Sequence, residues 1–583
     1  MNDNASLSYS ISDRGEGVIS SDGVFDLRAG QKISFDLKSG GYWFGHGFNH
    51  VQPCPLETGS IVNPSFAVNN IQSPIWMCSS GTAILAETKR LLDVRLNENG
   101  DGKLHIISPD APLRLRTWQR ATLPAAQLAL LTHLGWPNQP PSASILGDSL
   151  FCTWTQYPRY LTQDRILEMA TQIHARGYPC STLIIDDRWE SRFGELAFSG
   201  DFPDPAAMIQ KIHSLGLKVW LWVTPFVNQE AACFEELSRK KILVPSRKHG
   251  GAALFKWWGG TAGLIDVTAP QGREWLQKKL QYLQESYGVD GFKIDGGDFK
   301  YQPAPDEADW HAFAGESGYS DALLSFFEEL TPNACETRTA WLSQQRSIIW
   351  RQGGKDSHWG LDNGLAAMIT LGLHLGLMGY DILIPDMIPG RVQTMKADDP
   401  LATDELFIRW TEASAFMPLL QFSYFPWNYA KETESTVRTY ALLHKKLQPY
   451  LVKHASNRQA PLIRPLWYDA PYVDELYIVF DEYMLGPDLL VAPVLGSGST
   501  SRDILLPPGN WTDAWTGIQV KEGWHRKYPA PCPGIPIFVR SEQEELTVLL
   551  KTELSVIQRG TIAPDVATAN YSAGLNRDLK VTG

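Results

Sequence analysis

The sequence has no long apolar run and no cluster of lysines and arginines. A membrane-spanning helix needs about 20 predominantly apolar residues, so the sequence predicts no membrane span. The net charge is −12 at pH 7, and neither a nucleic acid nor an anionic membrane surface is expected as a partner. The first ten residues contain neither a basic stretch nor the apolar core of a secretory signal. We therefore expect a cytoplasmic protein.

Cysteine pairs and nucleotide-binding motifs are missing as well. The seven cysteines are scattered and none lies in a CxxC pair, which argues against a disulfide framework and against zinc fingers. No GxGxxG or GxxxxGK[ST] motif follows a predicted strand, so a nucleotide site has no support. No cofactor is expected.

Aromatic residues, in contrast, are abundant, with 21 Trp, 20 Tyr and 23 Phe. Sugars present C–H faces that stack on aromatic rings, although most aromatic side chains of a protein simply fill its core. The composition is therefore compatible with carbohydrate binding without establishing it.

At 583 residues the chain is too long for one hydrophobic core. Residues 1–117 are short alternating segments broken by Gly, Asn and Asp, a pattern that favours an antiparallel β-sandwich. The aromatic, glycine-rich segment Gly41–His50 could reach over a neighbouring site. Residues 118–145 combine a helical stretch with the proline-rich segment Pro137–Ser142 and are interpreted as a linker.

Residues 146–459 alternate between apolar strands and helices, which predicts a parallel sheet and, at this length, a (β/α)8 barrel. Thr162 is the expected N-cap of the first long helix. Residues 460–540 return to β-type alternation, including a strand expected at Leu476–Phe480, and predict a C-terminal β-domain. Residues 541–583 are predicted to be a distal β segment or tail.

Acidic residues follow several predicted barrel strands. Asp186 and Asp187 follow one strand, Asp295 follows Val289–Ile294, and Asp386 follows another apolar run. Gly296 and Gly297 allow a sharp turn directly after Asp295. Because catalytic residues of such barrels lie at the C-terminal ends of the strands, these carboxylates are candidates for catalysis, although a lone Asp-Gly is more often a turn or a helix cap.

A group of acids with few cations has two chemical uses, divalent metal binding and glycoside cleavage. A metal site would need further ligands at suitable spacing, and only the pair Asp186 and Asp187 begins to offer them. Glycoside cleavage needs one ionised and one protonated carboxyl group. Asp295, and Asp356 in the glycine-rich loop 350–360, suit those two roles.

Several motifs resemble glycoside hydrolase family 31. They are Gly291-Phe-Lys-Ile-Asp295, Asp404-Glu-Leu-Phe-Ile-Arg-Trp410, Gly486-Pro-Asp-Leu-Leu-Val-Ala-Pro-Val494 and Leu506-Pro-Pro-Gly-Asn-Trp511. The resemblance spans roughly residues 40–540. It implies retaining α-glycosidases with an N-terminal β-sandwich, a catalytic (β/α)8 barrel and C-terminal β-domains, the order inferred above from the residues.

Within the family the chain is most similar to the branch that contains the myogenesis-regulating glycosidase and bacterial α-galactosidases. Four stretches carry this similarity: Lys256–Gly263, Lys355–Gly360, Ile384–Met387 and Ala415–Trp427. Family 31 α-glucosidases commonly have Arg-x-His, whose His helps to bind the sugar, where this chain has Gln421-Phe-Ser423. The difference implies an altered sugar pocket.

The resemblance implies that Asp295 is the nucleophile and Asp356 the acid/base. The usual Trp-x-Gly-Asp of the family is here Gly-Gly-Lys-Asp, and Asp362 lies close by. Lys293 should point to the same side of its strand as Asp295 and favour its ionised form. Asp356 should keep its proton near neutral pH, and retention requires the two carboxyl groups to lie about 5–5.5 Å apart.

Further residues are candidates for substrate binding. Asp186 and Asp187 are expected to accept hydrogen bonds from sugar hydroxyls, and Trp258 and Trp427 to form stacking walls. The full set of candidates is Asp186, Asp187, Trp258, Lys293, Asp298, Arg338, Arg351, Asp386 and Trp427. For each of these residues a purely structural role stays open as the alternative to substrate binding. The arginines could form ion pairs of the scaffold, the tryptophans could pack in the core, and Asp298 and Asp386 could cap turns. His358 and His374 are assigned to the scaffold.

The sequence therefore predicts a retaining exo-α-glycoside hydrolase, with α-galactosidase the favoured activity and a small oligosaccharide or glycoside as substrate. α-Glucosidase, α-xylosidase and sulfoquinovosidase activities are alternatives with the same mechanism. A non-catalytic sugar-binding protein and a metal-dependent barrel enzyme are alternatives of other classes. A homo-oligomer is compatible with the sequence.

Overall fold

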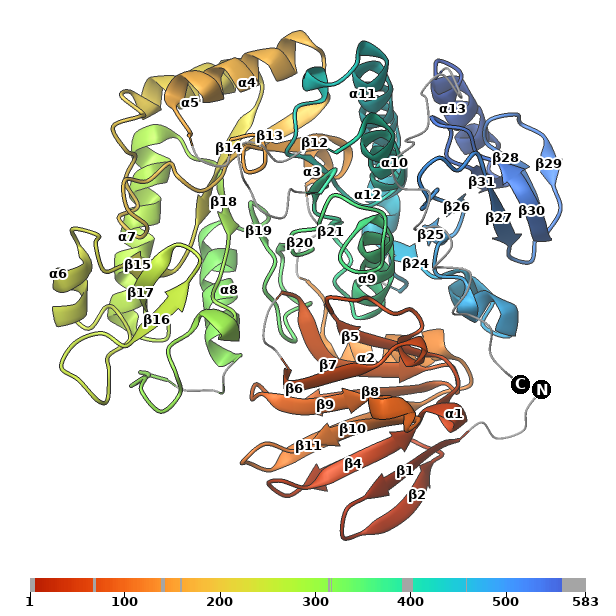
Figure 1. Cartoon of the computed structure of the whole chain (residues 1–583), viewed down its shortest axis with the longest axis horizontal. Helices are drawn as coiled ribbons and strands as arrows, with labels where there is room; N and C mark the ends of the chain where they lie inside the picture. The colour runs from red at the N-terminus through yellow and green to blue at the C-terminus, as the bar shows by residue number, and fades with distance from the viewer. Residues whose placement is uncertain are drawn as a thin grey trace.

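The computed structural model describes residues 6–66, 70–137, 142–157, 160–312, 315, 317–390, 402–457 and 459–557, with only the backbone for 64–66. An N-terminal β-sandwich packs against a parallel barrel, and a smaller β-domain lies on another side of the barrel (Figure 1). The predicted order of folds is confirmed. None of the helices in these ranges combines the length and apolar character needed to cross a membrane.

The N-terminal part consists of two antiparallel sheets. The first has the order β2 (Gly15–Ile19), β1 (Leu7–Ile11), β4 (Lys32–Asp36), β10 (Lys103–Ile107), β9 (Leu92–Leu96), β6 (Ile61–Phe66). The second has the order β3 (Gly23–Leu27), β11 (Leu113–Gln119), β8 (Thr82–Glu87), β7 (Gln72–Cys78), β5 (Trp43–Gly47). Alternating apolar side chains of both sheets, among them Ile33, Leu104 and Trp76, form the core between them.

The segment between sandwich and barrel contains a packed helix, α2 (Leu123–Leu134). The hydroxyl of Thr122 caps its N-terminus by accepting from the amide of Ala125. The helix is in contact with β7, β8 and β11, and the buried side chain of Gln127 donates to the carbonyl of Leu377 in the barrel, 3.0 Å away. This part of the predicted linker is therefore fixed to both domains. Of the proline-rich stretch, residues 138–141 lie outside the described ranges.

The barrel sheet is parallel throughout. Its order is β21 (Leu383–Ile384), β20 (Ile349–Arg351), β19 (Cys335–Thr337), β18 (Gly291–Ile294), β14 (Lys218–Val223), β13 (Cys180–Ile185), β12 (Ser149–Cys152), β23 (Leu420–Phe422), β22 (Met387–Ile388). The two terminal members, β21 and β22, are separated in the chain only by Pro385 and Asp386. They act as two pieces of one strand, so the sheet closes with eight strand positions.

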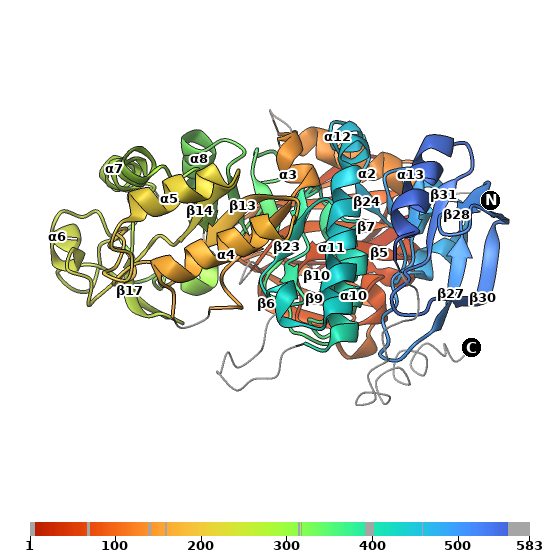
Figure 2. The same cartoon turned by 90° about the horizontal axis from the view of Figure 1, so that it is seen from above.

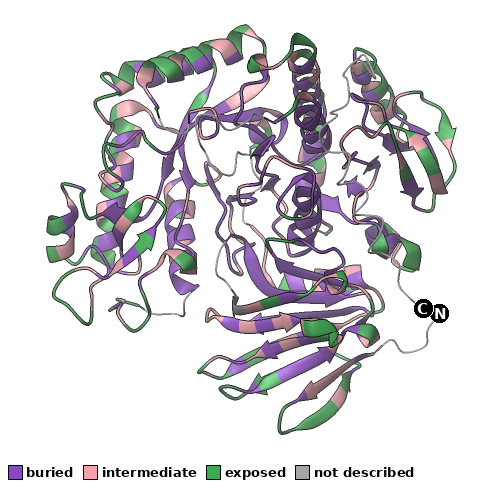
Figure 3. Ribbon diagram, in the orientation of Figure 1, coloured by how far each residue is buried: buried purple, intermediate pink, exposed green. Residues whose placement is uncertain are grey.

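Helices surround this sheet (Figure 2). They are α3 (Ala143–Gly147), α4 (Gln163–Ala175), α5 (Pro205–Ser214), α7 (Pro270–Tyr287), α8 (Gly318–Leu330), α9 (Leu365–Leu377), α10 (Asp404–Ser414), α11 (Lys431–Lys446) and α12 (Gln448–Ala455). The short helix α6 (Phe234–Arg239) lies farther out, in the segment between β14 and α7. Thr162 caps α4 as predicted. The barrel strands are almost entirely buried, whereas α4 and α5 expose one side to solvent (Figure 3).

Helix α9 is buried along its whole length because it contacts strand β5 of the sandwich. Within it, Nδ1 of His374 accepts from the amide of Gly45 at 3.1 Å, and Nε2 bonds the carbonyl of Pro53 at 2.9 Å. Both ring nitrogens of His374 thus join the barrel to the sandwich, the scaffold role expected for this residue.

After β14 the chain leaves the barrel for a three-stranded antiparallel sheet before it enters α7. The order is β15 (Phe226–Asn228), β17 (Gly260–Leu264), β16 (Leu254–Trp257). The turn between β16 and β17 carries Trp258, and the short 3-10 helix η3 (Phe299–Tyr301) lies next to β16. This excursion supplies one side of the site described below.

The C-terminal domain has a six-stranded sheet and a two-stranded antiparallel sheet. The order of the larger sheet is β24 (Ile463–Arg464), β25 (Tyr483–Leu485), β26 (Leu489–Val491), β31 (Ile537–Arg540), β28 (Trp511–Asp513), β29 (Gln519–Val520), and the smaller sheet pairs β27 (Ser501–Leu506) with β30 (Gly523–Pro529). The strand predicted at Leu476–Phe480 is wrong: Asp474–Ile478 form a 3-10 helix. There the ring of Tyr477 stacks on Trp467, with centroids 5.0 Å apart, so packing of the aromatic residue replaces strand pairing.

The β segment predicted after residue 540 is also wrong where the structure describes it. Residues Glu544–Leu554 form helix α13. The buried residues Leu550 and Leu554 are four positions apart and share one face of the helix, a helical periodicity that the sequence contains. Residues 558–583 of the predicted tail lie outside the described ranges.

Candidate active site

A cavity of about 470 Å³ lies at the C-terminal ends of the barrel strands. It is lined by Phe48, Asn70, Trp154, Asp186, Asp187, Trp222, Trp258, Lys293, Asp295, Lys300, Tyr301, Arg338, Arg351, Gly354, Asn363 and Met387. Seven of the residues selected from the sequence are among them: Asp186, Asp187, Trp258, Lys293, Asp295, Arg338 and Arg351. The topology of the barrel brings six of them together because parallel strands end on one face, and Trp258 comes from the turn between β16 and β17.

Asp295 follows directly after β18, and its amide donates to the carbonyl of Val223 in the neighbouring strand at 2.9 Å. The next two residues, Gly296 and Gly297, have φ values of 78° and 82°. A Cβ atom on Gly296 would lie 2.3 Å from the ring of Phe226. Only glycine fits this turn, and the turn places the carboxylate of Asp295 at the cavity.

Three donors hold the carboxylate of Asp295. Nε of Arg338 lies 2.5 Å from Oδ1, the amide of Gly296 donates to the same oxygen at 3.0 Å, and the indole of Trp222 donates to Oδ2 at 3.1 Å. Burial would raise the pKa of this carboxyl group, but the charges of Arg338 and Arg351 and the hydrogen bond from Trp222 outweigh it and hold the pKa below its ordinary value. The group is an ionised carboxylate at neutral pH.

Lys293, two residues before Asp295, also lines the cavity but pairs with a different acid. Its Nζ lies 2.6 Å from Oδ2 of Asp186 and 3.9 Å from Oε1 of Glu336. Burial works against the charged ammonium, yet the neighbouring carboxylates raise the pKa of Lys293 above its ordinary value. Asp186 also accepts from Sγ of Cys152 at 3.0 Å. Lys293 therefore acts on Asp295 through its charge, not through a direct contact.

Asp187 lies beside the ion pair of Lys293 and Asp186, and the pKa of its own carboxyl group is raised. Burial, reinforced by the charge of Asp186, raises the pKa of Asp187 to about 8. The nearest counter-charge is the half-exposed Arg188, whose Nε is 3.7 Å from Oδ1 of Asp187. At neutral pH the carboxyl group of Asp187 can therefore donate a hydrogen bond as well as accept one.

Arg351 is the last residue of strand β20 and is paired with Glu336, an acid that was not among the candidates selected from the sequence. Its Nε donates to Oε1 of Glu336 at 3.0 Å, and Oε2 of Glu336 accepts from Nε2 of Gln421 at 3.1 Å. Glu336 is completely buried beneath the cavity, in strand β19. Its buried negative charge links Lys293 and Arg351, and so helps to fix the cations on either side of Asp295.

Trp258 stands at the mouth of the cavity with 45% of its surface exposed. The guanidinium carbon of Arg338 lies 5.6 Å from its ring centre, and the ring of Tyr301 contacts it edge-on at 4.9 Å. An exposed indole held by neighbouring side chains offers a flat apolar surface for stacking.

The loop that carries Asp356 reaches the cavity through Gly354 and Asn363. Asp356 is buried, with Oδ2 accepting from Nδ2 of Asn363 at 3.0 Å and its amide donating to the carbonyl of Asn363 at 2.9 Å. It is not among the cavity-lining residues. The alternative, Asp362, has a side chain that is 49% exposed and lies 3.7 Å from His358. The acid/base role of Asp356 remains a prediction.

Three further predicted binding residues do not line the cavity. Asp298 is buried, accepts from Oγ1 of Thr339 at 3.4 Å and lies 3.7 Å from Nη1 of Arg338; burial raises its pKa to about 6. Asp386 is completely buried, and its Oδ2 accepts from the amide of Lys355 at 2.6 Å. Both support the loops around the site.

Trp427 lies elsewhere in the fold. Its ring packs on Phe151 and Phe425, with centroid distances of 6.1 and 4.7 Å, and the guanidinium of Arg176 lies 5.4 Å from it. Trp427 therefore packs at the outer side of the barrel, the alternative that the sequence left open for it, and offers no wall to this cavity.

Six lining residues were not singled out from the sequence: Asn70, Trp154, Trp222, Lys300, Tyr301 and Asn363. Trp222 lies in the apolar strand β14, and its residue type alone does not distinguish a site residue from a core residue. Phe48 comes from the Gly41–His50 segment, which was expected to reach a neighbouring site, and it does so. Asn70 comes from the sandwich, and no local signal connects it with the barrel.

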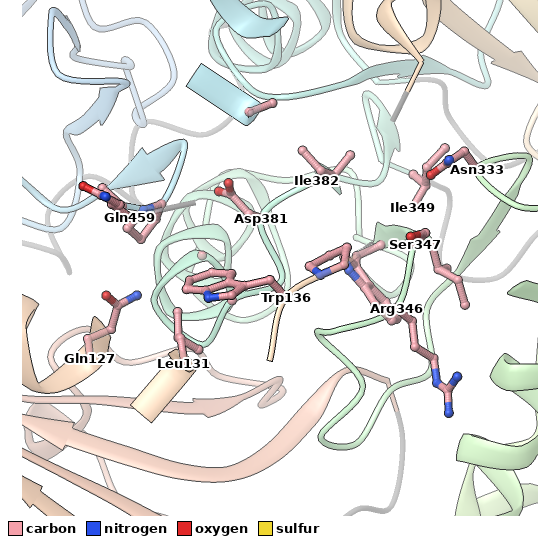
Figure 4. A pocket seen from close by; sticks show the side chains of 18 residues that line it. Gln127, Leu131, Trp136, Asn333, Arg346, Ser347, Ile349, Asp381, Ile382 and Gln459 are labelled. Carbon is pink, nitrogen blue, oxygen red and sulfur yellow. The ribbon is translucent and has the colours of Figure 1, made fainter. Parts of the chain in front are cut away.

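A second, much smaller cavity of about 60 Å³ lies at the opposite end of the barrel, near the N-terminal ends of β20 and β21 (Figure 4). Trp136, Ile382 and Gln459 are among its walls, and Asp381 is the one carboxylate among its lining residues. Burial raises the pKa of Asp381 to about 7, and its Oδ1 accepts from the amide of Leu462. With a single acid, this cavity cannot perform two-carboxylate chemistry.

Within the described residues, no group of three or more His, Cys, Asp and Glu side chains has an arrangement that could hold a metal ion. Asp186, one of the two acids considered for that purpose, is paired with Lys293.

Comparison with known proteins agrees with this architecture. The glycosyl hydrolases family 31 TIM-barrel domain matches residues 138–454, the family's C-terminal domain matches residues 459–543, and the myogenesis-regulating glycosidase N-terminal domain matches residues 4–122. A family 31 dextranase of Flavobacterium johnsoniae, complexed with glucose, superimposes with a TM-score of 0.77 at 22% identity, over 89% of this chain and 67% of that one. This structural likeness shows the fold.

Two curated relatives are more similar in sequence. The myogenesis-regulating glycosidase of Mus musculus is 34% identical over 384 residues, which is 64% of this chain and 53% of the relative. The 1,3-alpha-isomaltosidase of Kribbella flavida is 30% identical over 380 residues, 59% of this chain and 50% of the relative. The chain thus spans about half the length of these relatives. Because the TIM-barrel domain alone covers more than half of the chain, the protein belongs to glycosyl hydrolase family 31.

Proposed function

We propose that this protein is a retaining, exo-acting α-glycoside hydrolase whose preferred substrates are α-galactosides. The observation that carries the proposal is the state of Asp295, an ionised carboxylate held by Arg338, Trp222 and Gly296 at the wall of a cavity of about 470 Å³. That volume lies in the usual range for small-molecule sites, about 300–1,000 Å³. An oriented, deprotonated carboxylate beside such a cavity is suited to attack an electrophilic carbon.

The proposed reaction is a double displacement. The carboxylate of Asp295 attacks the anomeric carbon while Asp356 gives its proton to the departing glycosidic oxygen, which produces a β-glycosyl ester and the free alcohol. Asp356 then removes a proton from a water molecule, the water oxygen attacks the same carbon, and the ester bond to Asp295 breaks. The released sugar has its original α-configuration, and both carboxyl groups return to their starting protonation states.

Positive charge develops on the sugar ring in the transition state, and the ionised Asp295 opposes it. Asp186 and Asp187 are assigned to hydroxyl groups of the sugar. Because the pKa of Asp187 is about 8, its protonated form can donate to a hydroxyl oxygen, whereas Asp186, held by Lys293, accepts. Trp258 is assigned to the apolar face of the substrate at the cavity mouth.

The choice of galactose depends on the resemblance to the α-galactosidase branch and on the residues that replace Arg-x-His. Gln421 donates to the buried Glu336, and Oγ of Ser423 accepts from the amide of Thr155 at 2.7 Å. Neither side chain lines the cavity, so neither takes the place of a sugar-binding histidine. α-Glucosides are the second candidate because a relative is a 1,3-alpha-isomaltosidase, and α-xylosides and sulfoquinovosides follow.

A panel of 4-nitrophenyl α-glycosides tests this proposal. We expect the galactoside to be hydrolysed with the highest kcat/KM, and proton NMR of the first product to show the α-anomer. Good turnover of the glucoside without turnover of the galactoside would show that glucose is the preferred sugar. The proposed mechanism would be unaffected by that result. Sugar binding without turnover of any substrate would favour a non-catalytic protein, and activity that EDTA abolishes would favour a metal-dependent enzyme.

A further inference from the structure

Two residues of the N-terminal sandwich part, Phe48 and Asn70, belong to the wall of the barrel cavity. Asn70 lies two positions before strand β7, is buried, and lines the cavity between the barrel loops. Its φ is 59°, in the left-handed region that asparagine adopts more readily than most residues. The backbone turn at Asn70 thus directs a sandwich side chain into a site that is otherwise built mainly by the barrel.

The backbone on both sides of this contact is held by hydrogen bonds. Ile71 forms a parallel bridge with Ala340, and the amide of Gln72 donates to the carbonyl of Ala340 at 3.3 Å. The amide of Leu342 donates to Oγ of Ser73 at 3.2 Å. The start of β7 is therefore paired with the loop that follows β19, and this is the loop that begins with Arg338.

The side chain of Asn70 contacts both catalytic loops. Its Oδ1 accepts from Nη1 of Arg338 at 3.1 Å, and Arg338 in turn pairs with Asp295 through Nε at 2.5 Å. A Cβ atom on Gly353 would lie 2.1 Å from the same Oδ1, so the amide packs directly against the backbone of the loop that leads to Asp356. The carbonyl of Gly353 also accepts from Nζ of Lys355 at 3.1 Å.

Arg338 has a second acid within reach. Its Nη1 lies 3.7 Å from Oδ2 of Asp298, while its Nε contacts Asp295. A guanidinium group with several donors can rotate between two carboxylates unless another acceptor fixes its plane. The oxygen of Asn70 is such an acceptor.

We propose that Asn70 is a positioning residue: it orients Arg338 toward Asp295 and away from Asp298, and it fixes the start of the loop that carries Asp356. The effect of Asn70 on catalysis rests on the proposed function, because Asp295 and Asp356 have catalytic roles only in that proposal. This role of Asn70 also gives the sandwich a part in catalysis, because the orientation of the nucleophile depends on a side chain from another domain.

Two substitutions separate this role from simple packing. Asn70→Gly removes the side chain while keeping a residue that tolerates positive φ. Asn70→Asp keeps an acceptor oxygen at the same place. Asn99→Gly is the matched control, because Asn99 belongs to the same domain, also has a positive φ of 54° and is exposed.

For Asn70→Gly we expect kcat on the best 4-nitrophenyl glycoside to fall about 10- to 100-fold, the scale expected for misplaced catalytic groups, with a much smaller change in KM. Asn70→Asp should recover most of kcat, and Asn99→Gly should match the wild type. All variants should melt close to the wild-type temperature. Unchanged kcat in Asn70→Gly, or a loss that Asn70→Asp does not recover, would overturn the proposal.

A crystal structure of Asn70→Gly gives a readout independent of turnover. We expect the contact between Nε of Arg338 and Oδ1 of Asp295 to be lost and the guanidinium to move toward Asp298. If the wild type hydrolysed no glycoside, the proposed function would fail, and this structure alone would decide the positioning role. An unchanged Arg338–Asp295 pair would contradict it.

Discussion

Arg338 and Asp295 form a partly buried ion pair in which Nε and Oδ1 are 2.5 Å apart. The pair joins the ends of the adjacent strands β18 and β19. A charge-assisted hydrogen bond of this kind keeps the carboxylate ionised and also fixes its plane. Trp222 holds the other oxygen from β14, so three neighbouring strands fix one carboxylate in position.

Asp295→Asn should reduce kcat by about 10⁴- to 10⁶-fold, the scale seen when a nucleophile is removed. The amide has nearly the same shape as the carboxylate but cannot form the glycosyl ester. Steady-state hydrolysis of the best 4-nitrophenyl glycoside measures the loss, and thermal melting checks the fold. Asp309→Asn, at a largely exposed carboxylate, is the control. An Asp295→Asn variant with more than a tenth of wild-type activity would end the nucleophile assignment.

Asp356→Ala and Asp362→Ala decide between the two candidates for the acid/base. We expect the first to lower kcat/KM by about 10²- to 10⁴-fold on substrates with a poor leaving group, because general acid–base catalysis contributes that much. The loss should be smaller for 4-nitrophenyl glycosides, whose leaving group needs little protonation. Asp362→Ala should behave like the wild type, since its side chain is half exposed. The reverse result would transfer the role to Asp362.

Arg338→Gln should move the acidic limb of the kcat/KM profile to higher pH. The reason is that Arg338 holds the pKa of Asp295 below its ordinary value against the effect of burial. Asp295 acts only when ionised, so activity exists above its pKa, and raising that pKa removes activity at low pH first. Arg247→Gln, at an exposed arginine, should leave the profile in place. An acidic limb that does not move in Arg338→Gln would show that another group sets it.

Lys293→Met should destabilise the protein by about 3–5 kcal/mol, because it leaves the buried carboxylate of Asp186 without its partner. Urea unfolding at neutral pH measures the change in the free energy of unfolding. The double variant Lys293→Met with Asp186→Asn should recover part of the loss, since it removes the unpaired charge. Lys278→Met, which breaks an exposed pair with Glu274, is the control and should change stability little. A Lys293→Met variant as stable as that control would contradict the argument.

The local pattern of the sequence determined most of the architecture and the first acids of the site. Apolar strands alternating with helices specify a parallel barrel, and the C-terminal ends of parallel strands share one face. For that reason Asp186, Asp187 and Asp295 were predicted to share this face, and all three line the cavity, whereas Asp386, predicted in the same way, does not. Gly296 and Gly297 marked the turn after Asp295 because their φ values are unfavourable for other residues.

Short-range sequence patterns do not predict the structure where tertiary packing decides the conformation of a segment or the surroundings of a side chain. Leu476–Phe480 alternates like a strand, but Asp474–Ile478 form a 3-10 helix that contains the buried Tyr477. Trp427 has the residue type of a sugar-stacking wall but packs on Phe151. Both cases have one cause: a short apolar or aromatic stretch does not encode which surface covers it.

The sequence by itself determined the barrel, its two flanking β-domains and the carboxylates at the strand ends. Only the tertiary structure decided which charges meet. It paired Lys293 with Asp186 instead of Asp295, put Glu336 beneath the cavity, and brought Asn70 from the sandwich to Arg338, 268 positions later in the chain. The physical reason is that strand and helix periods act over a few residues, whereas ion pairs form between segments that only the packed fold brings into contact.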